Sequence, residues 1–217
     1  MVTLSVRAAK CRLNAAKAVP LTSRIGIYAG TFDPVHAGHV KFALQATENA
    51  KLDEIYFLPE RKPRNKQGVE HFGHRVAMLN RASRPHPKFS VLEMNDVSFT
   101  VKRTIPALRK RFPASQLVFL FGSDVIEQLP EWTHSDKLLR DNELVIGIRA
   151  TEDMESVQKI IDDWPVHPKS VTLLYSSAPE VSSRKIRDAL RLQQETQGTL
   201  MSVRQYSDQH WLYVALS

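Results

Sequence analysis

The sequence predicts an α/β fold in which a doubly wound parallel sheet forms a single domain and helices follow at its C-terminal end. Short apolar runs of five or six residues alternate along the chain with segments of helical period. Strands that are apolar throughout are typical of parallel sheets with helices on both faces. Glycine-rich and charged segments come directly after the strands, which is where such sheets bind ligands.

The strands are recognised by β-branched or wholly apolar runs with a clear end. The first run stops at Gly30, the second at Pro59, and a run without any polar residue stops at Gly122. Strands are expected at residues 24–28, 54–59, 89–94, 117–122, 143–149 and 170–175.

The helices are recognised by apolar residues spaced three or four apart. Val40, Ala43 and Leu44 show this spacing in one segment, and two adjacent serines precede another. Pro106 is expected to lie in the first turn of its helix or to kink it. Helices are expected at residues 39–52, 72–83, 101–112, 155–164 and 182–191, with a last one within 201–216.

Composition is that of an ordinary globular protein. The chain has 217 residues, of which 42% are hydrophobic and 24% charged. No apolar run approaches the roughly 18–20 residues that a membrane span needs. The single cysteine, Cys11, excludes an internal disulfide framework and a cysteine-rich zinc site, and favours a reducing, cytoplasmic location.

The positive charge lies mainly in the first residues. Residues 1–24 contain five basic residues and no acid, so the rest of the chain holds only +2 of the net charge of +7. A nucleic-acid groove needs clustered charge on the folded body, so such a partner is not expected. We interpret residues 1–23 as a basic N-terminal extension and residues 24–217 as the folded domain. Organelle targeting by the extension is the alternative.

The segment Tyr28–Val40, YAGTFDPVHAGHV, follows the first strand and opens the first helix. Glycine beside a strand end lets backbone approach a ligand, and a helix N-terminus favours an anion. A tight turn with two surface histidines explains the same residues. Zinc is a further alternative, because His36 and His39 lie three residues apart, but no third ligand is placed to complete a site.

Two further segments follow strands. In VSSRKIR, at 181–187, cations in the first helical turns oppose the helix dipole, a conflict that a bound phosphate would resolve. Helix capping alone explains the serines. In FGSDVIEQLPEW, at 121–132, Asp124 can bind ribose hydroxyls and Trp132 can stack on a ring. Capping and core packing are the alternatives there.

Taken together, these motifs resemble the signatures of the nucleotidylyltransferase superfamily. Gly30–Pro34 followed by His36-Ala37-Gly38-His39 is similar to its GTFDP-x-HxGH motif, and Ser182-Ser183-x-x-Ile186-Arg187 to its ISSTxIR motif. The segment SFTVKRTIPAL, with GSD and Trp132, is similar to the bacterial nicotinate/nicotinamide mononucleotide adenylyltransferases. The resemblance runs from about residue 24 to the C-terminus and implies a Rossmann-like fold.

The resemblance implies that the chain transfers the AMP part of ATP to a pyridine mononucleotide, releasing pyrophosphate. It implies that ATP binds to Gly30, Thr31, Phe32, His36, His39, Gly122, Asp124, Ser182, Ser183 and Arg187. His36, His39 and Arg187 would be the catalytic residues, and Thr100 and Trp132 would bind the mononucleotide. Mg²⁺ would be held by the ATP phosphates, without protein metal ligands.

Three departures from the family pattern concern the acceptor more than the reaction. Arg184 replaces a threonine and Phe99 a tyrosine, and a basic loop with Arg64 and Lys66 replaces a proline-rich element. We expect Arg64 and Lys66 to form a lid over phosphates, an ordinary solvated loop being the alternative. A different acceptor, such as phosphopantetheine or a phospho-alcohol, and an inactive nucleotide-binding regulator are the rival functions. A homo-oligomer remains an open possibility.

Overall fold

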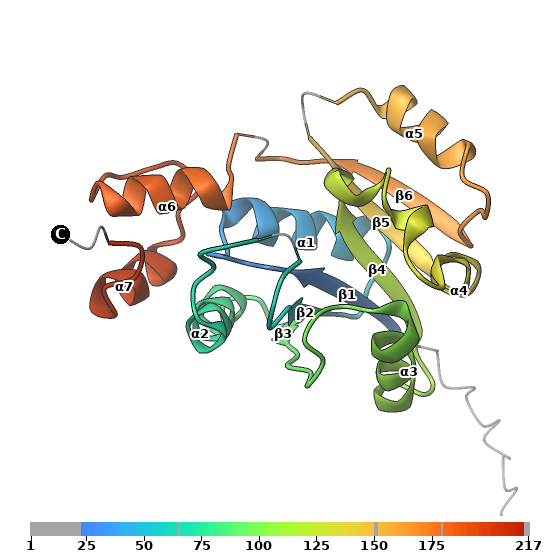
Figure 1. Ribbon diagram of the computed structural model, residues 1–217, viewed down its shortest axis with the longest axis horizontal. Helices are drawn as coiled ribbons and strands as arrows, with labels where there is room; N and C mark the ends of the chain where they lie inside the picture. The colour runs from blue at the N-terminus through green and yellow to red at the C-terminus, as the bar shows by residue number, and fades with distance from the viewer. Residues whose placement is uncertain (1–22, 65, 150–151, 179, 215–217) are drawn as a thin grey trace, which may run out of the picture.

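The computed structural model describes residues 23–64, 66–149, 152–178 and 180–214, and its centre is a six-stranded parallel sheet. The strand order is β3-β2-β1-β4-β5-β6 (Figure 1). The strands are β1 (Arg24–Gly30), β2 (Glu54–Pro59), β3 (Phe89–Val91), β4 (Gln116–Gly122), β5 (Glu143–Ile148) and β6 (Ser170–Tyr175). This is the doubly wound, Rossmann-like order that the sequence predicts.

Helices cover both faces of the sheet. One buried cluster joins α1 (Ala37–Asn49), α2 (Phe72–Ser83), α6 (Ser183–Arg191) and α7 (Met201–Gln209) to the sheet, and the other joins α3 (Val101–Arg111), α4 (Ser135–Asp141) and α5 (Met154–Asp162). Along β4, Val118 and Leu120 belong to the first cluster and Phe119 to the second. This alternation explains why the strands are apolar at every position.

Most element boundaries agree with the sequence, and the exceptions have local causes. The expected strand 89–94 is only three residues long, because it is the edge strand and pairs with β2 alone. The last helix ends at Gln209, since Trp211 and Tyr213 have positive φ values of 53° and 63° that an α-helix does not use. The short helix α4 and the 3₁₀ turns Ser123–Val125 and Leu129–Glu131 are not expected from the sequence.

The winding of the sheet reverses between β1 and β4. Chain order runs outward from β1 to β2 and β3 on one side, and from β4 to β5 and β6 on the other. Ligands of doubly wound sheets bind beyond the carboxyl ends of the strands at this reversal. Here the loop 31–36 leaves β1 and the turn 123–125 leaves β4, so these two segments mark the place to look for the site.

Candidate active site

The loop between β1 and α1 is built on a buried aromatic side chain. Phe32 is 2% exposed, adopts a positive φ of 51°, and packs with ring centroids 5.3 Å from Tyr28 and 5.1 Å from His39. A Cβ at Gly30 would lie 3.0 Å from the Phe32 ring. Gly30 therefore makes room for Phe32, and only the backbone of Phe32 is available to a ligand.

The two histidines of this loop lie face to face at the N-terminus of α1. Their ring centroids are 3.7 Å apart, and the His36 backbone N–H donates to Nδ1 of His39 at 3.2 Å. Because Nδ1 of His39 accepts this hydrogen bond, the neutral ring carries its proton on Nε2. His39 is therefore prepared to donate a hydrogen bond from Nε2.

Burial keeps both histidines neutral at pH 7. His36 is 7% exposed, and burial lowers its pKa to about 4. Burial also lowers the pKa of His39 well below its ordinary value, and repulsion from the Lys66 cation, and from His36 whenever that ring is protonated, lowers it further. Nδ1 of His36 is buried without a hydrogen-bond partner among the described residues. Such an unpaired buried group is typical of a site that awaits a polar ligand.

Gly38 is required by the position of His36. A Cβ at Gly38 would lie 3.0 Å from two ring atoms of His36. Any larger residue would push this ring away from His39. The glycine of the HAGH segment thus has a packing role that supports the histidine pair.

The start of α6 is joined to the same loop across 149 and 154 residues of sequence. Ser183 Oγ donates to the Pro34 carbonyl at 3.0 Å, and Arg187 Nη1 donates to the Asp33 carbonyl at 2.6 Å. Ser182 caps the helix by accepting from the Lys185 N–H at 3.3 Å. The serine and arginine expected at the pyrophosphate therefore lie directly beside the loop that carries the histidines.

The other two cations in the first turns of α6 make no hydrogen bond to the loop 31–36. Arg184 is exposed, and Lys185 is exposed with its Nζ donating to the Glu180 carbonyl at 3.0 Å. Of the three basic residues in the first turns, Arg187 alone contacts the loop 31–36. The replacement of the family threonine by Arg184 thus adds a charge at the surface.

Arg64 and Lys66 come from the basic loop after β2, and both reach toward the site. Lys66 Nζ donates to Thr31 Oγ1 at 2.9 Å, and Arg64 Nη2 donates to the Phe99 carbonyl at 2.9 Å. Both side chains are on exposed residues. Arg61, by contrast, lies over the Phe72 ring and donates to the Met94 carbonyl, so it takes no part in this arrangement.

The end of β4 places an exposed carboxylate beside the loop. Asp124 follows Gly122 in a 3₁₀ turn, and a Cβ at Gly122 would lie 2.7 Å from Asp124 Oδ1. Gly122 is therefore needed for this position of the carboxylate. Ser123 Oγ is buried and finds no hydrogen-bond partner in the part of the chain that the structure describes.

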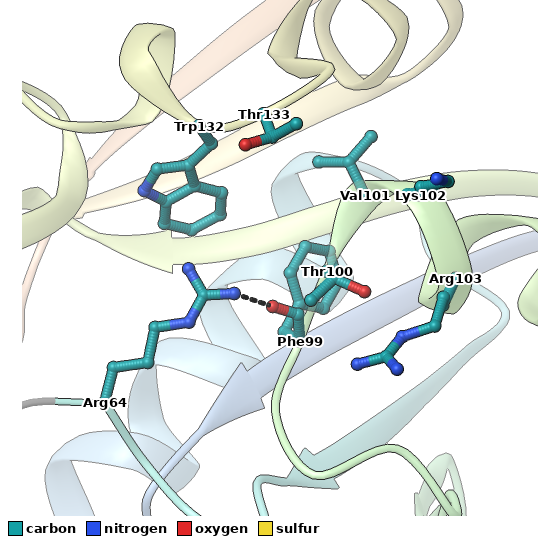
Figure 2. Close-up of a pocket in the computed structure, with 8 residues that line it drawn as sticks. All are labelled: Arg64, Phe99, Thr100, Val101, Lys102, Arg103, Trp132 and Thr133. Atoms are coloured by element: carbon teal, nitrogen blue, oxygen red, sulfur yellow. Dashed lines mark hydrogen bonds between the residues drawn. The ribbon is translucent and has the colours of Figure 1, made fainter.

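A pocket of about 390 Å³ lies next to these groups (Figure 2). It is lined by Arg64, Phe99, Thr100, Val101, Lys102, Arg103, Trp132 and Thr133. Trp132 and Phe99 form an aromatic wall with centroids 6.0 Å apart, and the Arg64 guanidinium extends toward Phe99 near Trp132. Oγ1 of Thr100 is buried and unpaired among the described residues. The two residues expected at the mononucleotide, Thr100 and Trp132, thus share one pocket.

Two buried groups hold this arrangement together, and the sequence points only to the first, since either His74 or Arg75, at the start of its helix, is expected to face the site. Arg75 is 1% exposed and donates to the carbonyls of Thr31, Arg61 and Glu70 at 2.7, 3.1 and 2.9 Å. Tyr213 donates to Asp33 Oδ1 at 2.7 Å. Neither belongs to a motif with characteristic spacing, and the only sequence signal is the arginine in an otherwise amphipathic helix. His74, the alternative to Arg75 in this expectation, instead bonds with the Tyr206 hydroxyl.

Metal-binding clusters and membrane-spanning helices are both absent from the residues that the structure describes. No group of three or more histidine, cysteine, aspartate or glutamate side chains is arranged there to hold a metal ion. In the same residues, none of the helices is both long enough and apolar enough to span a bilayer. Residues 1–22, which contain Cys11 and most of the basic extension, lie outside the described residues.

Comparisons with known proteins agree with this geometry. The family model described as Cytidylyltransferase-like matches residues 27–189. The nicotinate-nucleotide adenylyltransferase of Bacillus subtilis (strain 168) is 34% identical over 199 residues, covering 88% of this chain and 98% of that protein. A probable nicotinate-nucleotide adenylyltransferase of Bacillus pumilus is 33% identical, with the same coverage.

A solved structure shares the fold. It is the Plasmodium falciparum nicotinic acid mononucleotide adenylyltransferase complexed with NaAD, with a TM-score of 0.72 and 20% identity over 88% of this chain and 97% of that one. The chain therefore belongs to the cytidylyltransferase-like family and, within it, to the nicotinate-nucleotide adenylyltransferases, which are nucleotidyltransferase enzymes.

Proposed function

We propose that this chain joins the AMP part of ATP to nicotinate mononucleotide in the biosynthesis of NAD. A phosphate oxygen of the mononucleotide attacks the α-phosphorus of ATP, the bond from that phosphorus to the β-phosphate oxygen breaks, and pyrophosphate leaves with the electron pair. This proposal rests mainly on one observation, the contact between the start of α6 and the loop before α1, which are the two segments expected to bind phosphate. Arg187 and Ser183 of α6 bond to the very loop that leads into the histidine pair of α1.

The arrangement suits a reaction that depends on alignment and charge stabilisation more than on covalent help. In this proposal, His39 donates from Nε2 to the α-phosphate, and its contact strengthens as charge develops there. His36 donates to a neighbouring phosphate. The β- and γ-phosphates lie against Ser182, Ser183 and Arg187.

The adenosine and the basic loop are proposed to lie on either side of the phosphates. The backbone of Gly30, Thr31 and Phe32 runs beside the nucleotide, and Asp124, after Gly122, binds its ribose. Lys66, whose Nζ is at Thr31, closes over the phosphates from the basic loop. Arg64, whose guanidinium is at the Phe99 carbonyl, meets the mononucleotide in place of the phosphate role expected from the sequence.

The pocket beside Trp132 is proposed to take the pyridine ring of the mononucleotide. Trp132 and Phe99 offer aromatic surface for stacking, and Thr100 has an unpaired hydroxyl among the described groups. The lining contains three cations and no acid, and two of the cations, Arg64 and Lys102, have no ion pair among the described residues, whereas Arg103 lies 3.5 Å from Asp96. A positive lining favours the carboxylate of nicotinate over the uncharged amide of nicotinamide, in keeping with the names of the relatives.

The donor set also fits Mg²⁺ that arrives with ATP. The buried carboxylate near the phosphates, Asp33, is already bonded to Tyr213 and lies 3.7 Å from Arg187, so it is not offered to a metal. The surrounding groups are histidine N–H, hydroxyl and guanidinium donors, which bind phosphate oxygens. When bound to the ATP phosphates, Mg²⁺ would supply additional neutralisation of their charge.

The proposal is tested by measuring pyrophosphate release from ATP with a panel of acceptors. We expect rapid release with nicotinate mononucleotide, slower release with nicotinamide mononucleotide, and background release with phosphopantetheine or without an acceptor. Preference for phosphopantetheine would support the first rival function. Binding of ATP without release across the whole panel would support the inactive regulator.

A cytoplasmic location is also part of the proposal. The cytoplasm fits a chain with one cysteine and a nucleotide substrate. Salt-dependent nucleic-acid binding that disappears when residues 1–23 are removed would contradict the small role we give the basic extension.

A further inference from the structure

The Asp33 carboxylate lies at the centre of a buried network that the adenylyl-transfer motifs do not explain. Asp33 is 3% exposed, and its Oδ1 accepts from the Tyr213 hydroxyl at 2.7 Å. A weaker contact of 3.4 Å joins Oδ1 to the Glu70 N–H, and Oδ2 lies 3.7 Å from Arg187 Nη1. The carbonyl of the same residue accepts from Arg187 Nη1 at 2.6 Å.

We infer that Tyr213 is a positioning residue for Arg187, acting through the carboxylate of Asp33. This inference rests on the proposed function, in which Arg187 binds the phosphates that leave as pyrophosphate. The segment after α7 would then be a working part of the phosphate site, although it lies 180 residues beyond Asp33 in the sequence.

The direction of the Tyr213 hydrogen bond is fixed by its surroundings. Burial, and next the negative charge of Asp33, raise the pKa of the Tyr213 hydroxyl. The hydroxyl therefore keeps its proton and donates to Oδ1. The ring itself is part of the apolar cluster that also holds Ile186 of α6, so it is firmly placed. A donor in a fixed position sets the rotation of the carboxylate that accepts from it.

The rotation of the carboxylate in turn decides which N–H groups of Arg187 can bind a phosphate. Both contacts of Arg187 with Asp33 use Nη1. Within the described part of the chain, no hydrogen bond is made by its Nε or Nη2, so these N–H groups can meet a phosphate. Without the Tyr213 hydroxyl, Oδ1 would keep only the 3.4 Å contact with Glu70. The buried carboxylate would then turn toward Arg187 and compete with the ligand for the guanidinium.

The test compares two tyrosine-to-phenylalanine substitutions that each remove one hydroxyl. Tyr213→Phe removes the bond to Asp33, and Tyr206→Phe removes the bond of 2.9 Å to His74. Dissociation constants for inorganic pyrophosphate and for nicotinate mononucleotide are measured by calorimetry on the full chain. For Tyr213→Phe we expect the dissociation constant for pyrophosphate to rise about tenfold or more, as when a hydrogen bond to a charged group is lost. The dissociation constant for the mononucleotide should stay within about twofold.

The matched control separates this role from general packing. Tyr206→Phe should leave both constants within about twofold, because its hydroxyl is bonded away from the phosphate groups. Equal loss of pyrophosphate binding in the two variants, or an unchanged constant in Tyr213→Phe, would overturn the inference. Failure of the unmodified chain to bind pyrophosphate at all would instead count against the proposed function.

A double substitution tests whether Tyr213 acts through Arg187. In an Arg187→Met background, adding Tyr213→Phe should change the pyrophosphate constant by less than about twofold, because the guanidinium it positions is gone. Additive losses would contradict the inference.

Asp33→Asn is a second test that can be used if Tyr213→Phe does not fold, since the amide keeps the shape of the side chain but removes its charge. Because the amide cannot compete for the guanidinium as a charged group, Asp33→Asn should not weaken pyrophosphate binding, and a rise of about tenfold in this constant would overturn the inference.

Discussion

At the scale of single residues, His39 shows how an uncharged side chain can stabilise negative charge that develops on a phosphate. Burial keeps the ring neutral, and the His36 N–H occupies Nδ1, so the proton must sit on Nε2. A neutral donor binds the ground-state phosphate weakly and gains strength as negative charge accumulates during transfer.

His39→Ala should therefore lower kcat much more than it weakens ATP binding. We expect kcat to fall about 100- to 1,000-fold, as when one donor to a developing oxyanion is removed. The dissociation constant for ATP should rise less than about tenfold. Steady-state kinetics and calorimetry measure the two quantities. His167→Ala is the control, because His167 is exposed in the segment before β6, away from the carboxyl ends of the strands. Equal changes in kcat and in ATP binding would refute the role of His39.

Arg64 is the residue expected to distinguish the acid from the amide. Its guanidinium is held at the Phe99 carbonyl beside the Trp132 pocket. In Arg64→Ala, kcat/KM for nicotinate mononucleotide should fall about tenfold, the size of one charge-assisted contact, with little change for nicotinamide mononucleotide. Arg84→Ala, an exposed arginine directly after α2, is the matched control. Parallel losses with both acceptors would show that Arg64 binds the shared phosphate.

The sequence predicts the groups that meet the ligand better than the groups that hold them. His36, His39, Ser183 and Arg187 lie in short motifs whose residue types already suggest phosphate chemistry, and the structure brings the two motifs into contact. Tyr213 could not be found in this way, because its partner is 180 residues distant. A hydrogen bond between such distant residues depends on the whole fold and leaves no periodic pattern in the chain.

At the scale of elements, α2 is the helix whose buried charge connects loops on either side of the site. Arg75 donates to the carbonyl of Thr31 in the loop after β1, and to those of Arg61 and Glu70 at the two ends of the basic loop. The segment between these two ends carries Arg64 and Lys66. Arg75 thus fixes the two ends of the loop that carries the expected lid residues.

Arg75→Met should destabilise the protein and loosen this loop. Three carbonyls would lose their donor, so we expect the free energy of unfolding to fall by about 3 kcal/mol or more. Urea denaturation measures the loss, and limited proteolysis should show faster cleavage within residues 61–70. Arg81→Met on the same helix is the control, because Arg81 is exposed and lies over the Tyr206 ring. It should cost at most about 1 kcal/mol. Similar losses of unfolding free energy in both variants would contradict the role of Arg75 in holding the ends of this loop.

Element boundaries follow from the sequence wherever the pattern is long enough. The expected ranges of β2, α2 and β6 agree with the structure at both ends. The seven-residue helix α4 spans only about two helical turns, too few for a periodic apolar pattern to predict it. The end of α7 was misplaced because the apolar residues 211–214 continue its composition while their backbone turns away, with positive φ at Trp211 and Tyr213.

At the scale of the whole molecule, the histidine pair makes stability depend on pH. In the folded chain the pKa of His36 is about 4, whereas in the unfolded chain it returns to 6.5. Between these values the unfolded state binds more protons than the folded state, so stability rises with pH through this window and falls on acidification. The depression of this pKa corresponds to about 3 kcal/mol, lost progressively from pH 6.5 down to pH 4.

His36→Gln should flatten this dependence, because glutamine fills similar space without a group that titrates. Urea denaturation at a series of pH values between 4 and 7 gives the free energy of unfolding of both proteins. The unmodified chain should lose about 3 kcal/mol more than His36→Gln across this range, while the exposed His167→Gln control should follow the unmodified chain. His39 has a lowered pKa of the same cause, so the variant keeps part of the slope. Identical slopes in all three proteins would mean that His36 is protonated as readily in the folded state as in the unfolded one, and its role as a buried neutral donor would have to be abandoned.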